Sequence, residues 1–418
     1  MIERQALPDK RVLCIDMKSF YASCSAMLCG LDPLTCYLAV VADVNRSGSV
    51  VLAASPRLKQ EFGIRTGSRL FEIPKDERIQ VVDAQMKTYL RVSSEITRLL
   101  HRYVPKHAIH TYSVDESFLT LSGTDRLWGD AMETAQEIRD QVYEQFHLPC
   151  AIGIGPNMLL AKLCLDLEAK RKGISEWTYA DVPTKLWPIK PLSAVWGIGK
   201  RMERRLERIG ITTIGQLAQF PLHRLEKMFG VIGTQLYYHA HGLDFSELGA
   251  PIMGGQISFG KSQILMRDYE KEIDVKRVLL EMCEETARRA RKQRMCGRTI
   301  SLGIGYSKQY GGGFHRSLTI DEPTNGTLAI YEACLTLFKQ HYASYPVRKI
   351  SVTLSNVEMD DQIQLSLFDE RSEKQRTLGY VMDGLRRKYG YDAVLRAVSY
   401  TEAGTAKHRS TLIGGHKA

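Results

Sequence analysis

Apolar residues in the first part of the chain gather in short runs that predict buried strands. Such runs cover residues 12–15 and 150–155. Residues 38–54 form a longer apolar stretch, and turn-forming residues interrupt it at 45–48, which is typical of a hairpin. The β-forming residues 110–114 complete the set. Together these runs predict a sheet.

Between these runs, apolar residues recur at helical spacing. Residues 88–104 place apolar side chains three or four positions apart, which predicts an amphipathic helix. Its inner face is expected to comprise Leu90, Ile96, Leu99, Leu100 and Tyr103. Further helices are predicted at 56–62, 130–147 and 157–171. Helices that alternate with strands and cover one sheet indicate an α/β or α+β layer.

The pattern changes twice further along the chain. Residues 193–245 carry short helical segments without a convincing strand, after a connector rich in proline. Beyond a glycine-rich break, strand-like runs alternate with long helices. The strands are expected at 300–306, 314–320 and 349–357, and the helices at 272–295 and 325–342. The resulting order of strand, helix, strand, strand, helix, strand is typical of a split βαβ unit.

Composition narrows the class of protein. At 418 residues the chain is too long for one hydrophobic core, so several domains are expected. No apolar run approaches the length of a membrane span or forms a secretory signal. The nine cysteines include no CxxC pair, which argues against a zinc ribbon or disulfide framework and for reduced thiols in the cytoplasm. The 57 Lys and Arg exceed the 47 Asp and Glu, a balance that favours a polyanionic partner.

Three carboxylates stand at the ends of two predicted strands. Asp16 ends the first run, and Asp115 and Glu116 follow residues 110–114. If the two strands are neighbours, the acids converge, and without compensation they would repel one another and take up protons. A pair of Mg²⁺ ions removes this conflict, because two ions about 3.5–4 Å apart can hold the attacking and leaving oxygens of a phosphoryl transfer. Turn caps or surface ion pairs explain any one acid, but explain all three together less well.

A glycine-rich turn before a basic helix indicates contact with a nucleic-acid backbone. Gly197 and Gly199 flank one residue, and Lys200 begins a predicted helix whose outer side is rich in arginine. Such a turn between short helices lets backbone N–H groups approach a phosphate, as in a helix-hairpin-helix. Helix-capping glycines with a solvated basic face are the alternative interpretation.

A second basic cluster lies between residues 288 and 298. It ends a predicted helix, and the helix dipole accounts for two of its cations. Its six basic residues exceed that need, so a surface that follows phosphates without reading sequence is the better explanation. The expected DNA contacts in this cluster are Arg288, Arg291, Arg294 and Arg298.

Three segments resemble, in order and spacing, the palm motifs of the Y-family translesion DNA polymerases. They are residues 16–23 (DMKSFYAS), residues 112–117 (YSVDES), and residues 153–155 (GIG) followed by 160–162 (LAK). The branch that the chain resembles is that of the bacterial ultraviolet-damage repair proteins of the UmuC and UvrX kind. The combined motifs are highly specific, and the similarity extends from residue 10 to about residue 370.

The resemblance implies a multidomain α+β fold of the right-hand polymerase type. A ferredoxin-like catalytic palm is expected at 1–19 and 83–176, small fingers at 20–82, a helical thumb with the helix-hairpin-helix at 177–245, a linker at 246–254, and an α+β little finger that binds DNA at 255–357.

The resemblance also assigns the three acids to catalysis. Asp16, Asp115 and Glu116 would be the ligands of two Mg²⁺ ions, and the backbone carbonyl of Met17 would complete one of the two sites. Primer-template DNA and a dNTP would be the substrates.

Further residues would hold the nucleotide. Tyr21 would be the steric gate, where an aromatic ring clashes with a ribose 2′-OH, and Phe20 would shape the floor of the sugar pocket. Lys162 matches the lysine that neutralises the incoming triphosphate. Lys59 is the choice for a further phosphate contact, and Arg57 stays open, because the helix there is one residue longer than the family's commonest form.

Two positions depart from the family's pattern. Lys18 stands where the family usually has Asp or Asn, and Ser25 stands where it has an acid. Neither position is normally a metal ligand, so activity is expected to survive. Lys18 is a candidate for balancing the carboxylates or contacting a phosphate.

Residues 358–418 are polar, and basic at their end, and predict a tail with one short helix near 373–388. Within this tail, residues 364–368 (QLSLF) resemble the peptide that binds the bacterial sliding clamp, β. Apolar anchors in a polar tail can fill a pocket only on a partner. The expected clamp contacts are Gln364, Leu367 and Phe368.

The sequence therefore predicts an error-prone translesion DNA polymerase that adds dNTPs to a primer 3′-OH on damaged template DNA. It is expected to act as a monomer in the cytoplasm, in the SOS response and DNA repair, without a membrane segment. A non-catalytic DNA-binding or clamp-associated protein with the same fold is the alternative, but the intact acids, Tyr21 and Lys162 speak against it. A two-metal nuclease is less favoured, because no general base for water is evident beside the acids.

Overall fold

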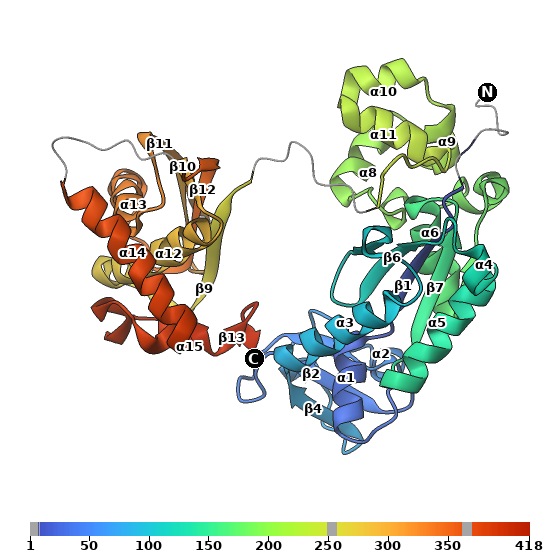
Figure 1. The fold of residues 1–418 in the computed structure, drawn as a ribbon, viewed down its shortest axis with the longest axis horizontal. Coiled ribbons are helices and arrows are strands. Elements are labelled where there is room, and N and C mark those ends of the chain that lie inside the picture. The colour runs from blue at the N-terminus through green and yellow to red at the C-terminus, as the bar shows by residue number, and fades with distance from the viewer. Residues whose placement is uncertain (1–6, 8, 249–256, 362–369) are drawn as a thin grey trace. The chain divides into compact units, whose positions relative to one another are not determined.

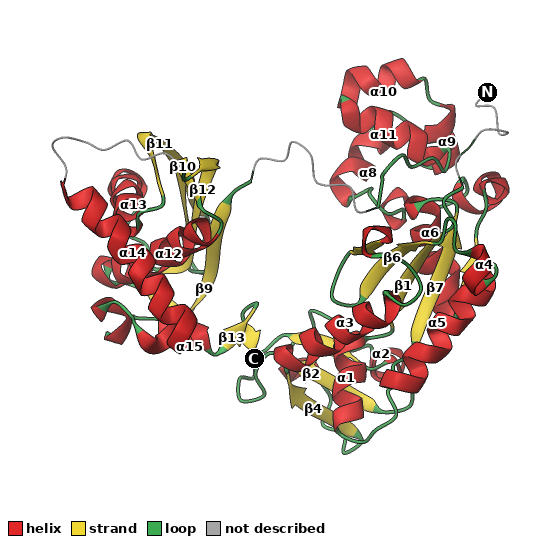
Figure 2. Cartoon of the chain, in the orientation of Figure 1, coloured by secondary structure: helices red, strands yellow, loops and turns green. Residues whose placement is uncertain are grey.

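The computed structural model describes residues 7, 9–248, 257–361 and 370–418. The chain divides into two compact units, which comprise residues 1–251 with 416–418, and residues 252–415 (Figure 1). Both units combine helices and strands (Figure 2), and this confirms the predicted α+β class.

A five-stranded sheet with the strand order β5-β6-β1-β7-β8 forms the centre of the first unit. Its strands are β1 (Val12–Met17), β5 (Ile109–Thr111), β6 (Glu116–Thr120), β7 (Cys150–Gly155) and β8 (Ile174–Glu176). β1 lies between β6 and β7 and is antiparallel to both. The apolar run at 12–15 is fully buried, as its pattern predicts. The strand that carries Asp16 is therefore held from both sides.

Helices pack on this sheet and bring further residues to it. They are α3 (Met86–Leu100), α4 (Asp125–Trp128), α5 (Ala131–Phe146), α6 (Met158–Cys164) and α7 (Lys170–Lys172), with a π-helical turn at Leu165–Ala169. α6 lies so close to β7 that a Cβ at Gly153 would be 2.3 Å from the Ala161 carbonyl oxygen. Because only glycine fits there, the GIG sequence lets the helix that carries Lys162 approach the sheet.

Two details of the predicted helices are wrong. Leu90 is 40% exposed and does not belong to the inner face of α3, where the neighbouring Tyr89 is buried instead. The helix predicted at 157–171 is interrupted by the π-helical turn, which changes the direction of the side chains after it. Such turns are frequent at functional sites.

A smaller three-stranded sheet comes next in the first unit. It consists of β2 (Tyr37–Val41), β3 (Val51–Ala54) and β4 (Ile79–Asp83) in the order β3-β2-β4, together with α1 (Phe20–Leu28) and α2 (Pro56–Phe62). β2 and β3 are antiparallel, which confirms the predicted hairpin. α2 ends at Gly63, whose φ of 67° is a left-handed conformation that favours glycine. The predicted helix at 56–62 is therefore confirmed.

The last part of the first unit is helical. Residues 193–245, all of them described, contain α8 (Lys200–Glu207), α9 (Ile214–Gln219), α10 (Leu222–Phe229) and α11 (Val231–Ala240) and no strand, as predicted. Their apolar side chains share one core with Leu159, Leu160 and Leu163 of α6. The helical part therefore packs directly on the helix that carries Lys162.

The second unit is an antiparallel sheet with the strand order β11-β10-β12-β9. Its elements are β9 (Phe259–Tyr269), α12 (Glu272–Lys292), β10 (Met295–Tyr306), β11 (Gly313–Thr324), α13 (Thr327–His341) and β12 (Val347–Met359). Apolar residues of both helices and of the sheet form a single core. The order of strand, helix, strand, strand, helix, strand confirms the predicted split βαβ unit.

The C-terminal residues correct a prediction, because they are not a tail. α14 (Glu370–Tyr389) lies beside α12 and α13 (Figure 1), and α15 (Ala406–Ser410), β13 (Leu412–Ile413) and β14 (His416–Lys417) follow. Arg386 and Arg396 bind Glu284 of α12 at 3.4 and 3.1 Å, and Arg409 binds Glu281 at 3.3 Å. Part of the polar composition of this segment therefore reflects ion pairs that join it to α12.

Candidate active site

The three acids meet at one edge of the five-stranded sheet, at the end of β1 and the start of β6. Asp16 stands opposite Glu116 in the antiparallel register, and the Met17 N–H donates to the Asp115 carbonyl oxygen at 3.0 Å. Glu116 is therefore the first residue of β6 and Asp115 directly precedes it, so their predicted place at the end of a strand at 110–114 is wrong. The reason is geometric, because antiparallel neighbours bring the end of one strand to the start of the next. We call this place the acid edge.

Each acid at this edge has a neighbouring partner. Lys162 Nζ lies 2.8 Å from the Glu116 carboxylate, and Lys170 Nζ lies 3.4 Å from that of Asp16. Ser113 Oγ donates to the Asp115 carboxylate at 2.6 Å. Within the described residues, no group of three or more His, Cys, Asp and Glu side chains is arranged to hold a metal ion. Each of the three carboxylates therefore has a lysine ammonium group or a hydroxyl as its partner.

The donor set at the acid edge nevertheless suits Mg²⁺, which prefers carboxylate and carbonyl oxygens. Burial raises the pKa of Asp16 to about 6, Lys170 opposes this shift, and Asp115 and Glu116 add to it. The carboxylates therefore repel one another across the edge, and a divalent cation relieves such repulsion. The residues present fit the ion that the sequence predicts.

Two lysines at the acid edge differ in their access to solvent. Asp166 links them, because its carboxylate lies 3.3 Å from Lys162 Nζ and 2.9 Å from Lys170 Nζ. Burial lowers the pKa of Lys162, but the hydrogen bond to Glu116 and the field of Asp166 outweigh it and raise this pKa above its ordinary value. Lys162 is only 6% exposed, whereas the side chain of Lys170 is 41% exposed. A ligand from solvent therefore reaches Lys170 more easily.

Lys170 and Asp166 were missed by the reasoning from sequence. The spacing of four residues from Lys162 to Asp166, and again to Lys170, was a usable signal, since side chains four apart on a helix are neighbours. The signal did not show that the second lysine reaches Asp16, which depends on how α6 and α7 lie on β1 and β7.

Two of the predicted nucleotide contacts lie just after β1. Phe20 is buried at the start of α1, and Tyr21 beside it is half-buried, with a pKa raised by burial and by the field of Asp115. Lys59 Nζ donates to Ser19 Oγ at 2.7 Å. Burial lowers the pKa of Lys59, and the field of Asp16 opposes that shift.

Of the two basic candidates on α2, Lys59 is the one near the acid edge. Arg57 is exposed and acts electrostatically on Tyr37. Lys18, which differs from the family's usual residue, lies two positions after Asp16. Its backbone N–H donates to the Pro149 carbonyl oxygen at 2.8 Å.

The glycine-rich turn forms the start of α8. Gly197 has a φ of 91°, which favours glycine, and Gly199 is the residue before the first helical residue, Lys200. Lys200, Arg201, Arg204 and Arg205 are exposed. The start of a helix offers backbone N–H groups to an anion, so this turn has the chemistry that a phosphate contact needs.

The second basic cluster faces the solvent only in part. Arg291 is 4% exposed, and its guanidinium binds Asp383 at 2.7 and 3.2 Å and the Asn325 carbonyl at 2.8 Å. The predicted phosphate contact of Arg291 is therefore wrong, because α14 covers this side of α12.

The other three arginines predicted to contact DNA are at least partly exposed. Arg288 is half-buried and binds Glu285 at 2.9 Å and 3.0 Å. Arg294 is exposed, and Arg298 binds the Asp321 carbonyl and lies 3.5 Å from Glu358. Arg288 and Arg298 contact groups of this chain, and Arg294 is open to solvent. A phosphate contact therefore stays a prediction for each of the three.

The predicted clamp contacts Gln364, Leu367 and Phe368 lie outside the described residues. Among the helices that the structure describes, none is long and apolar enough to cross a membrane.

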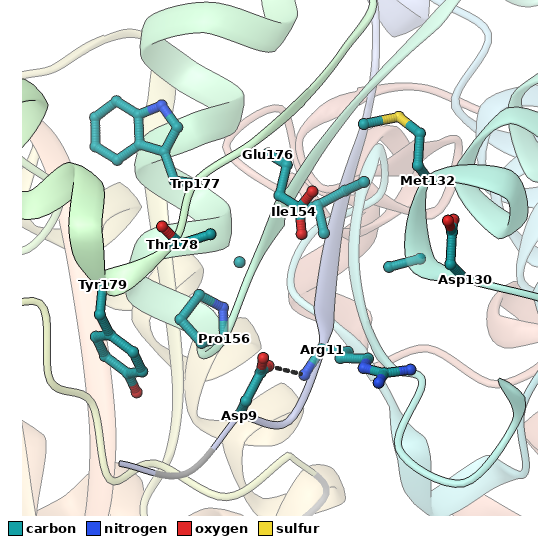
Figure 3. Close-up of a pocket in the computed structure, with 12 residues that line it drawn as sticks. Asp9, Arg11, Asp130, Met132, Ile154, Pro156, Glu176, Trp177, Thr178 and Tyr179 are labelled. Carbon is teal, nitrogen blue, oxygen red and sulfur yellow. Dashed lines mark hydrogen bonds between the residues drawn. The ribbon is translucent and has the colours of Figure 1, made fainter. Parts of the chain in front are cut away.

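Figure 3 shows the residues that line a cavity of about 290 Å³. The cavity lies at the end of the sheet where Val12 pairs with Gly155, opposite to the acid edge. It is lined by residues before β1, such as Asp9, and by residues at the ends of β7 and β8, such as Pro156, Glu176 and Trp177. Because strands separate it from the acids, this cavity is not part of the candidate active site.

The chain thus combines a sheet with an acid edge, a helical part with a glycine-rich turn and a separate α+β unit. Three sequence-family models match the chain. Residues 15–166 match the impB/mucB/samB family, residues 256–367 match the C-terminal domain of that family, and residues 194–244 match the thumb domain of DNA polymerase-iota.

Known proteins make the assignment more specific. The chain is 62% identical to the UvrX protein of Bacillus subtilis (strain 168), which is named as a UV-damage repair protein, with 100% of both chains covered. It is 38% identical to DNA polymerase IV 2 of the same organism, over 98% of this chain and 99% of the relative. A solved chimera of the Y-family DNA polymerases Dbh and Dpo4 shares the fold at a TM-score of 0.65 and 19% identity, over 84% of this chain and 99% of the chimera. The chain belongs to the Y family of DNA polymerases, and the predicted family, fold class and enzyme class are confirmed.

Proposed function

We propose that this chain is an active, error-prone translesion DNA polymerase that extends a primer 3′-OH on damaged template DNA. The observation that carries the proposal is the acid edge, where Asp16, Asp115 and Glu116 converge beside Lys162 and Lys170. A carboxylate cluster is costly to bury without a cation. A protein that only bound DNA would have no use for it, which argues against the non-catalytic alternative.

Two Mg²⁺ ions would be held by the side chains of Asp16, Asp115 and Glu116 and by the backbone carbonyl of Met17. When bound, the ions supply a lower pKa for the primer 3′-OH and stabilise the charge that develops on the α-phosphate and the leaving pyrophosphate. Lys162 would keep Glu116 in place, because its buried ammonium group is hydrogen-bonded to that carboxylate.

The incoming triphosphate would be neutralised mainly by Lys170 and Lys59. Both ammonium groups feel the field of Asp16, so both lie near the place where the metal-bound phosphates would be. Lys162, which the resemblance assigns to this role, is more deeply buried and would act through Glu116. Phe20 would form the floor of the sugar pocket, and Tyr21 would be the steric gate.

Lys170→Ala is expected to raise KM for a dNTP about tenfold to 100-fold, with a smaller change in kcat. The reason is that a charge-assisted hydrogen bond to phosphate contributes about 1.5–3 kcal/mol. Steady-state single-nucleotide insertion over a range of dNTP concentrations measures the effect. Lys172→Ala is the matched control, because this exposed lysine pairs with Glu168 at 3.2 Å instead. Equal KM values in the two variants would remove Lys170 from the site.

The remaining assignments concern DNA and domains. We propose that the palm, fingers and thumb occupy the first unit with the boundaries expected from sequence, and that the little finger occupies the second. Primer-template DNA would be held through its phosphates by Gly197, Gly199 and Lys200 of the thumb and by Arg288, Arg294 and Arg298 of the little finger, without Arg291.

The sliding clamp is the proposed protein partner, through residues 364–368. Replacing Leu367 and Phe368 together by alanine is expected to abolish most of the stimulation of synthesis by the clamp and to leave synthesis without the clamp unchanged. The side chains of Leu367 and Phe368 are the apolar groups that would fill a pocket on the partner. Primer extension with and without purified β clamp measures both rates, and an equal loss in the two assays would contradict the proposal.

Primer extension by the purified full chain tests the function itself. With Mg²⁺ present, we expect nucleotide addition on an intact template and synthesis past a thymine dimer or an abasic site. If neither template supports extension with Mg²⁺ or Mn²⁺ while the chain still binds primed DNA, the non-catalytic alternative holds and the proposal is refuted.

A further inference from the structure

Ser25 departs from the family's pattern, and the structure shows what it contacts. Its Oγ lies 2.6 Å from the hydroxyl oxygen of Tyr89, and both residues are buried. The ring of Tyr89 stacks on that of Tyr21 with the centroids 4.6 Å apart and the planes 17° apart. One tyrosine of α3 therefore contacts two residues of α1.

The spacing of these residues explains how one side chain reaches both. Tyr21 and Ser25 are four positions apart on α1, so they lie on the same face, about one 5.4 Å turn from each other. The Tyr89 ring covers the first position, and its hydroxyl reaches the second. Tyr89 also meets the edge of the Phe20 ring, with the centroids 6.5 Å apart. The two aromatic residues at the start of α1 are thus braced by another helix.

We propose that Tyr89, held in place by Ser25, is a positioning residue for sugar selection. This inference rests on the proposed function, in which Tyr21 is the steric gate. A ring rejects a ribose 2′-OH by collision only if it cannot turn away from it. Tyr21 is half-buried, and the stacked Tyr89 ring blocks one of its faces, which restricts the rotamers open to it.

The hydroxyl pair explains why Tyr89 stays in that position. A buried phenol hydroxyl needs a hydrogen-bond partner, and Ser25 is that partner without bringing a charge into the buried site. Tyr21 lies near the acid edge, since it follows β1 at the start of α1 and Asp115 acts on it electrostatically. The gate ring is therefore in contact with Tyr89 and near the three acids beside which the nucleotide would bind.

The test is the ratio of kcat/KM for dATP to kcat/KM for ATP in single-nucleotide insertion by the full chain. Tyr21→Ala is expected to lower this ratio most, since it removes the gate. Tyr89→Phe and Ser25→Ala are each expected to lower it about threefold to tenfold, because each removes the same hydrogen bond. For that reason the double variant should fall no further than either single one. Tyr89→Leu, which removes the stacked ring as well, should lower the ratio by about tenfold or more.

Tyr269→Phe is the matched control, because it removes a buried tyrosine hydroxyl that donates to the Ala403 carbonyl oxygen at 3.0 Å in the second unit. Its ratio should equal that of the wild type. The inference is overturned if Tyr21→Ala lowers the ratio while the three variants at Tyr89 and Ser25 do not. If Tyr21→Ala leaves the ratio unchanged, the gate assignment fails and the inference fails with it. Absence of any dATP insertion by the wild type would instead refute the proposed function.

Discussion

Replacing Asp115 by asparagine together with Glu116 by glutamine is expected to lower primer extension at least about 10³-fold. These substitutions keep the size of the side chains and remove the two negative charges that lie beside Asp16 at the start of β6. The pair would no longer balance two divalent cations, and the transition-state charge on the phosphates would lose its compensation. Amides are preferred to alanine here, because the buried Lys162 donates a hydrogen bond to Glu116. Alanine at position 116 would remove that partner altogether, whereas the glutamine amide oxygen can still accept the bond. Single-turnover extension with excess enzyme measures the loss.

The opposite end of the same sheet offers a matched control. Asp9 and Glu176 line the cavity of Figure 3, away from the acid edge, and Asp9 accepts a hydrogen bond from the Arg11 N–H at 3.0 Å. Asp9→Asn with Glu176→Gln removes two acids from the first unit as well, and should leave extension within about twofold of wild type. Full extension by the Asp115 and Glu116 variant, or an equal loss in the control, would contradict the assignment of the acid edge to catalysis.

Arg291→Ala is expected to lower the free energy of unfolding of the second unit by about 3 kcal/mol. The substitution leaves Asp383 without its bidentate partner and removes a donor to the Asn325 carbonyl. We expect the lower end of the range for buried ion pairs, because Arg386 stays 3.8 Å from Asp383. The full chain is unfolded in urea, and hydrogen exchange is measured in peptides of α12. This measurement gives the free energy of unfolding of the second unit separately from that of the first.

Arg294→Ala provides the comparison, since this exposed residue lies three positions further along the chain. Its effect on stability should stay within about 0.5 kcal/mol. If Arg291→Ala instead keeps full stability, weakens DNA binding and flattens its salt dependence, Arg291 is a phosphate contact after all, and its burial under α14 has no role in stability.

Patterns that depend on neighbours in sequence predicted most of the fold. The hairpin at 38–54 follows from apolar runs on both sides of a turn, and the short helix at 56–62 is stopped by the glycine after it. The split βαβ unit follows in the same way from the order of its runs. In each case the preference of the local segment and its place in the core agree, so sequence alone was sufficient.

Features that depend on distant partners were not predictable in the same way. Arg291 looks like its exposed neighbours in sequence, and only Asp383, on a helix that sequence analysis assigned to a tail, makes it a buried residue. Asp115 and Glu116 follow β-forming residues, yet Glu116 begins the next strand and Asp115 directly precedes it, because residues 112–115 lie between β5 and β6. The sequence was sufficient to identify the three acids. Their positions relative to one another depend on the register in which β6 pairs with β1.

The lysines show the same limit within the candidate site. Lys162 was found by its motif, while Lys170 follows a π-helical turn that no apolar pattern indicates. Its distance of 3.4 Å from Asp16 depends on a tertiary contact between α7 and the end of β1.

The central claim is that the acid edge holds paired metal ions for nucleotide addition. A crystal structure of the chain with primer-template DNA, a non-hydrolysable dNTP and Mn²⁺, recorded for anomalous scattering, tests it most directly. The expected map has two metal peaks about 3.5–4 Å apart, both within coordination distance of Asp16, with Asp115 and Glu116 completing the set. A bound nucleotide whose metal peaks lie away from these three side chains would contradict the account.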